Sequence, residues 1–119
     1  MTRRLLLTTI ISMGIFNLFG QNKTTEYKFS DPEDKAIITC DHVLNGDRPI
    51  LYASHDAEGD WQFLCGHEDH TEDNAKVISL KQATEIDPSI NDLYEMPVNV
   101  GAERESVKDK WQPFRMPAE

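Results

Sequence analysis

The stretch that decides the fold is Asp60-Trp61-Gln62-Phe63-Leu64-Cys65-Gly66. Its odd-numbered apolar side chains alternate with Gln62 and Leu64, which is the period of a strand buried mainly on one face. A turn-like segment at residues 56–60 precedes it, and a second β-type run lies before that turn, at residues 50–55. The two runs predict a β-hairpin around which the rest of a small domain packs.

Elements on both sides of this hairpin follow from similar patterns. The β-branched run over residues 36–40 predicts a core strand, and residues 75–80 and 98–104 predict two more. Asp87 and Pro88 predict the start of a helix that reaches Glu95, because a capping side chain precedes Pro at the first helical position. Strands come first and short helices later, so we expect an α+β fold with a small antiparallel sheet and one or two short helices.

The ends of the chain predict segments outside this domain. Residues 36–105 are expected to form the domain, residues 21–35 a polar linker and residues 106–119 a C-terminal tail with docked aromatic side chains. Residues 1–20 match a secretory signal peptide, since two arginines precede a mostly apolar run of 15 residues. Such a run at ~1.5 Å per residue is short for a ~30 Å hydrocarbon core. We therefore expect a periplasmic or secreted protein with no membrane association after cleavage; an uncleaved N-terminal anchor is the alternative.

Acidic residues dominate the charge. The 119 residues hold 21 Asp and Glu against 12 Lys and Arg, a formal net charge of −9, and removal of residues 1–20 makes it −11. Nucleic acid is not an expected partner, because phosphate binding needs Lys and Arg. A basic protein such as a toxin is the expected partner, unless the charge only keeps the protein soluble. Residues 56–73 contain seven carboxylates and no Lys or Arg. The expected binding residues are Trp111 and these carboxylates: Asp56, Glu58, Asp60, Glu68, Asp69, Glu72 and Asp73.

Two cysteines follow the apolar N-terminal run, Cys40 and Cys65. An even number in an exported protein predicts a disulfide between them. Both also begin a C-x-H pattern, with His42 and His67 in the third place. Two thiolates and two imidazoles can complete a tetrahedral zinc site. A pair of buried thiols is the third alternative.

Other catalytic and metal motifs fit poorly. His67 and His70 are three residues apart, whereas H-E-x-x-H needs four. The carboxylates of residues 56–60 alternate as in calcium loops, but Trp61 occupies the position of the loop glycine. A Cys65–His67 nucleophilic pair has no evident orienting residue. We expect neither an enzyme nor a cofactor.

Several segments resemble a bacterial family of small uncharacterised domains: Gly46-Asp47-Arg48-Pro49-Ile50-Leu51-Tyr52, Gly59-Asp60-Trp61-Gln62-Phe63-Leu64-Cys65-Gly66 and Asp87-Pro88-Ser89-Ile90. Some members are labelled immunity proteins of polymorphic toxin systems. The resemblance covers about residues 36–112 and implies an α+β fold and toxin neutralisation, without a catalytic residue set. The leading hypothesis is therefore an exported binding module that neutralises a toxin through its acidic face. The alternative is a periplasmic metal-binding protein that uses Cys40, His42, Cys65 and His67.

Overall fold

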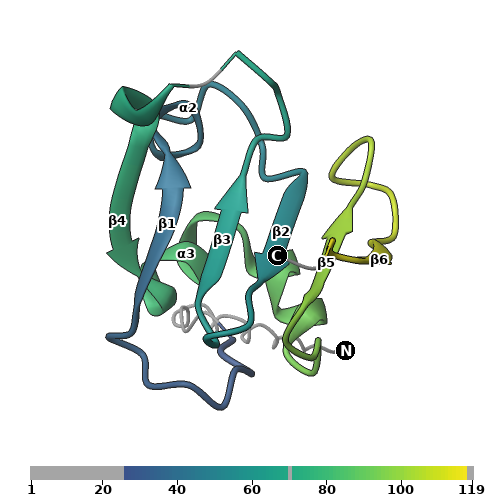
Figure 1. The fold of residues 1–119 in the computed structure, drawn as a ribbon. Helices are drawn as coiled ribbons and strands as arrows, with labels where there is room; N and C mark the ends of the chain where they lie inside the picture. Colours follow the sequence, from purple (N-terminus) through teal and green to yellow (C-terminus); the bar gives the residue numbers. More distant parts are fainter. Residues whose placement is uncertain (1–25, 70, 118–119) are drawn as a thin grey trace, which may run out of the picture.

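The computed structural model describes residues 26–69 and 71–117, so the predicted signal peptide lies outside the described residues (Figure 1). Six strands form one sheet in the order β4-β1-β3-β2-β5-β6. Within the described residues, no helix has the length and apolar character of a membrane span. The strands are β1 (Ala36–Cys40), β2 (Tyr52–His55), β3 (Trp61–Leu64), β4 (Ala75–Ser79), β5 (Val100–Glu103) and β6 (Gln112–Arg115). The helical elements are α2 (Asp41–Leu44) and α3 (Leu80–Ile86), with 3-10 helices η2 (Glu72–Asn74) and η3 (Pro88–Leu93).

The α+β class is confirmed, but the sheet is larger than predicted and it is mixed. β1 pairs in parallel with β3, with Ile38 opposite Gln62, while every other neighbouring pair in this sheet is antiparallel. The parallel pair arises because the hairpin places β3, rather than β2, beside β1. An all-antiparallel sheet was therefore a wrong expectation.

The predicted hairpin is present as β2 and β3, with His55 opposite Trp61. Its turn is closed by Asp56, whose Oδ1 accepts hydrogen bonds from the backbone N–H groups of Glu58 and Asp60, both at 2.9 Å. Gly59 takes the left-handed conformation that this turn requires, with φ of 88°. The carboxylate of Asp56 thus has a structural role in the hairpin.

One face of the sheet holds the hydrophobic core. Trp61 and Phe63 are buried on this face, and α3 and η3 lie behind the sheet in Figure 1. These helical elements contribute Leu80 and Ile90, which are both fully buried in the same cluster as the two aromatic residues. Alternation along β3 therefore sends its odd-numbered side chains into the core, as the sequence predicts.

Residues 26–35, expected to form a linker, pack on this core. Phe29 is 6% exposed, and its ring centroid lies 5.1 Å from that of Trp61 in an edge-to-face contact. The Trp61 indole N–H donates to Asp31 at 2.9 Å, and the backbone N–H of Lys28 donates to Asn91 at 2.8 Å. A single aromatic side chain in a polar stretch was too weak a pattern to predict this packing.

The expected C-terminal tail also joins the fold, because it contains β6. Trp111, predicted as a binding residue, is half-buried against Arg104, whose guanidinium carbon lies 4.1 Å from the centre of the indole ring. Arg104 also donates to Asp87 at 2.7 Å and to the carbonyl oxygen of Ile50 at 2.9 Å. Trp111 therefore helps to hold η3 and β5 together.

Candidate metal centre

The candidate site lies at the edge of the sheet where the parallel strands β1 and β3 both end. Cys40 is the last residue of β1, and Cys65 directly follows β3. α2 starts at Asp41 and carries His42 over the same edge. One potential ligand atom from each of Cys40, His42 and Cys65 lies within 4.8 Å of the other two. Three of the four residues of the predicted zinc site are thus brought together.

His67, the fourth predicted ligand, lies outside this group and is exposed. The prediction placed it beside Cys65 because residues i and i+2 of a strand share a face. Gly66 adopts φ of 82°, however, so the extended backbone of β3 does not continue to His67. The left-handed conformation of Gly66 therefore turns the chain, so that His67 does not lie beside Cys65.

The predicted disulfide is not formed. Neither cysteine is in a disulfide, and the two sulfurs are 3.8 Å apart, compared with ~2.05 Å in a disulfide bond. The side chains are buried, 2% and 1% exposed, and hydrogen-bond to each other as thiols. The prediction located the pair correctly and was wrong about the bond.

Arg48 is the cation nearest to this pair of thiols among the interactions described. Its Nη1 lies 3.7 Å from the Cys65 sulfur and 3.5 Å from Nδ1 of His42. Both guanidinium nitrogens also donate to the Asp69 carboxylate, each at 3.1 Å. Hydrogen bonds from Arg48 lower the pKa of Asp69 to about 2. The positive charge beside the sulfur is therefore balanced by a carboxylate.

Further polar groups surround the ligand set. Asp41 lies 3.4 Å from Nδ1 of His42 and accepts two hydrogen bonds from the Asn74 side chain, at 3.2 and 3.1 Å. A carboxylate beside an imidazole is the usual outer-shell partner of a metal-bound histidine. Burial raises the pKa of the Cys40 thiol, while backbone N–H groups of Val43 and Cys65 act in the opposite direction. Burial disfavours the negatively charged thiolate at this position. A bound cation would stabilise the thiolate by its positive charge.

Sequence reasoning did not identify Arg48 as part of this site. It is 17 residues from Cys65 and 21 from Asp69 along the chain, so no local motif connects them. The available signal was compositional: Arg48 is the last Lys or Arg before the carboxylate-rich stretch of residues 56–73.

The predicted acidic face is divided in two. Asp56, Glu58 and Asp60 lie in the turn before β3, and Glu68, Asp69, Glu72 and Asp73 lie in the segment after it, so β3 separates the two groups (Figure 1). Basic residues from elsewhere in the chain also reach both groups. Lys35 lies 3.4 Å from Asp60, and Arg48 binds Asp69. The expectation of one continuous face without basic neighbours was therefore wrong.

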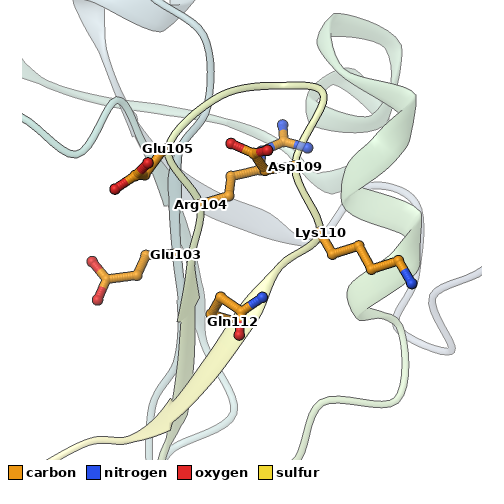
Figure 2. Close-up of a pocket in the computed structure, with 6 residues that line it drawn as sticks. All are labelled: Glu103, Arg104, Glu105, Asp109, Lys110 and Gln112. Carbon is orange, nitrogen blue, oxygen red and sulfur yellow. The ribbon is translucent and has the colours of Figure 1, made fainter.

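A groove of about 770 Å³ lies beside β5 and β6 (Figure 2). Its lining mixes charges of both signs: Glu103, Arg104, Glu105, Asp109, Lys110 and Gln112. The guanidinium of Arg104 is already engaged by Asp87. This groove therefore offers no convergent set of ligand-binding groups.

Comparisons with protein-family models, with curated proteins and with solved structures found no match. The family resemblance stays a prediction, and the function is argued below from the geometry.

Proposed function

We propose that this protein binds a thiophilic metal ion of the zinc class through Cys40, His42 and Cys65. The observation that carries the proposal is the convergence of three donor atoms, one from each of these residues, within 4.8 Å of one another. Zinc–sulfur bonds of ~2.3 Å at a tetrahedral angle place two thiolate sulfurs ~3.8 Å apart. The cysteine pair, 3.8 Å apart, therefore needs little rearrangement to hold one ion.

The chemistry of the donor set supports the same class of ion. Thiolate sulfur favours zinc and Cu(I), and imidazole suits both, whereas magnesium and calcium prefer oxygen ligands. Two thiolates would neutralise a divalent ion, and Arg48 and Asp69 already balance each other. Among the described residues, no further His, Cys, Asp or Glu joins the group. The fourth position would therefore hold water or another ligand.

Metal binding takes precedence over toxin neutralisation as the proposed function because the candidate ligands converge more closely than the acidic residues do. The carboxylates of the predicted acidic face form two groups at the ends of β3, and Asp60 and Asp69 are already paired with Lys35 and Arg48. Metal binding needs three donor atoms in one place, and these are within 4.8 Å of each other.

Metal titration of the full chain tests the proposal. Reduced, metal-stripped protein is titrated with Zn²⁺ against a chromophoric chelator, and with Co²⁺ as an optical probe of zinc sites. We expect about one ion per chain, a sulfur-to-cobalt charge-transfer band and the intense visible bands of tetrahedral Co²⁺. At a free zinc concentration 100-fold above Kd, the free energy of unfolding should increase by ~2.7 kcal/mol. This increase should raise Tm by about 10 °C or more. Wild-type protein without a thiolate–cobalt band would overturn the proposal.

Four variants assign the ligands. Cys40→Ser, Cys65→Ser and His42→Gln should each lose stoichiometric binding, while His67→Gln serves as the control and should keep it. Both cysteines are buried, so circular dichroism must show that each variant folds. His42, with a side chain 24% exposed, separates loss of a ligand from loss of the fold. Equal loss in His42→Gln and His67→Gln would contradict the three-residue site.

A further inference from the structure

The second face of the sheet differs from the face that carries the core. Ile38 lies opposite both Gln62 and Val77, so these three side chains form a row across β3, β1 and β4. By alternation along β3, Leu64 lies on the same face as Gln62. We call Ile38, Gln62, Leu64 and Val77 the open face. In Figure 1, α3 and η3 lie behind the sheet and no described helix crosses in front of β1 and β3.

The open face is apolar and accessible. Val77 is 66% exposed, more than any other large hydrophobic side chain described. Ile38, Gln62 and Leu64 are half-buried. A groove of about 370 Å³ runs over this face, lined by Ile38, Gln62 and Val77 and reaching Asp56 and Asp60 at the hairpin turn. A lone exposed valine needs no explanation, whereas apolar side chains along a groove are typical of a contact surface.

Carboxylates lie beyond both ends of β3. The turn before the strand carries Asp56, Glu58 and Asp60; Asp56 and Asp60 line the groove, and Asp60 pairs with Lys35. The segment after the strand carries Glu68, Glu72 and Asp73 in addition to Asp69, which pairs with Arg48. Four strand residues at ~3.3 Å each span only ~13 Å, so both groups are within reach of one partner. An apolar centre with a charged rim is the arrangement of protein–protein interfaces.

We propose that the open face is a docking surface for a protein that presents an apolar side chain surrounded by Lys and Arg. The rim carboxylates would steer this partner, and Ile38, Leu64 and Val77 would supply the desolvated contact. A second copy of the chain fits poorly, because each copy has a formal net charge of −9 and its two acidic groups would face like charges. The proposal does not rest on the metal centre, since the open face contains none of the three candidate ligands Cys40, His42 and Cys65.

A peptide pair of opposite charge tests the chemistry of this surface. The probe is a Lys-rich heptapeptide with a central Leu-Trp-Leu, and its counterpart has Glu in place of every Lys. Binding to the isotope-labelled full chain is followed by NMR. The Lys peptide should shift the methyl signals of Ile38, Leu64 and Val77, with an affinity that falls as salt rises. The Glu peptide should leave these signals unchanged.

A matched pair of variants separates docking from general charge attraction. Val77→Lys places a positive charge in the open face and should weaken Lys-peptide binding at least 10-fold. Val107→Lys makes the same change in charge at a side chain that is 53% exposed and lies between β5 and β6, so it should change binding less than 2-fold. Val77→Thr keeps the β-branched shape for β4 and serves as a second variant if Val77→Lys disturbs the strand.

Three results would overturn the proposal. If Val77→Lys and Val107→Lys weaken binding of the Lys peptide equally, the loss would be due to the change in net charge and not to the open face. Shifts confined to residues 56–60 and 68–73, with full binding by Val77→Lys, would place attraction at the carboxylates alone. A dimer of wild-type protein that Val77→Lys dissociates in analytical ultracentrifugation would identify a second copy as the occupant.

Discussion

The guanidinium of Arg48 belongs both to the candidate metal centre and to the acidic segment after β3. Its Nη1 lies near the Cys65 sulfur and the His42 ring, while both terminal nitrogens hold Asp69. Groups that hydrogen-bond to metal ligands typically change metal affinity by about 10–100-fold, ~1–3 kcal/mol. Arg48 therefore connects the proposed ligand set with residues that no local motif links to it.

The pKa of Asp69 reports on this contact. Arg48 lowers that pKa from its ordinary value of 3.8 to about 2. A carboxyl group with a lowered folded-state pKa stabilises the fold above its ordinary pKa and loses this contribution as pH falls through the folded value. The contribution of Asp69 should therefore be complete above about pH 4 and disappear near pH 2. An NMR titration of the Asp69 carboxyl carbon measures the midpoint.

Arg48→Met should return the pKa of Asp69 toward 3.8. Lys110→Met removes the same charge at the opposite side of the sheet, beside β6, and should leave the pKa at about 2. A similar rise in both variants would mean that overall charge, rather than the Arg48 contact, sets the value.

The site residues that the sequence revealed are those whose position follows from strand geometry. Cys40 and Cys65 end two predicted strands, and His42 follows closely after Cys40. His67 was misplaced because residues i and i+2 share a face only while the backbone is extended. Gly66 has a positive φ, so the extended conformation ends before His67. Arg48 was missed because its contacts depend on how distant segments pack.

At the scale of elements, local patterns and pairing differ in how far they can be predicted. The strand over residues 36–40 and the hairpin depend on alternation and turn chemistry, and both are present. The helix start at Pro88 is also present, with Asp87 as its cap, although the element is 3-10. The parallel pairing of β1 with β3 depends on contacts between residues 24 apart, such as Thr39 with the carbonyl oxygen of Phe63. Periodicity contains no information on such contacts.

β6 was not predicted because Pro113 interrupts it. Proline cannot donate to a neighbouring strand, so it is found mainly in edge strands, and β6 forms one edge of this sheet. Phe114 of β6 packs over Gly101 of β5, which lies opposite it in the pairing. The absence of a side chain at residue 101 therefore leaves room for the Phe114 ring.

Gly101→Ala tests whether β6 packs on β5 in this way. A Cβ atom at residue 101 would lie 2.5 Å from Cζ of Phe114 and 3.0 Å from the carbonyl oxygen of Ala53. We expect the free energy of unfolding to fall by ~1–3 kcal/mol through overpacking, measured by urea denaturation. Adding Phe114→Leu should recover part of the loss, because it shortens the clashing side chain. Wild-type stability in Gly101→Ala would contradict the described packing of β6.

At the scale of the whole molecule, the two faces of the sheet divide the proposed roles. The face toward α3 and η3 is closed by the buried core, and the open face is left for a partner. The candidate metal centre is at the end of β1 and β3, beside the acidic segment of residues 68–73. The core must therefore be complete without the open face, and residues 26–35 contribute to it.

Phe29→Ala tests this contribution. Phe29 is 6% exposed and contacts both Trp61 and Phe63, with ring centroids 5.1 and 6.2 Å away. Removal of a buried phenylalanine ring costs ~3–5 kcal/mol, which is a large part of the ~5–15 kcal/mol that stabilises a typical domain. We expect a loss of this size in urea denaturation, together with a change in Trp61 fluorescence, because the ring packs on that indole.

Ser30→Ala is the matched control, since Ser30 is the adjacent residue and is exposed. Its free energy of unfolding should stay within ~0.5 kcal/mol of wild type. If Phe29→Ala were equally neutral, residues 26–35 would be a linker, as the sequence alone predicts, and the domain would begin at β1. A loss confined to Phe29→Ala would instead show that the folded unit begins before β1, because only a side chain inside the core can leave a cavity when it is removed.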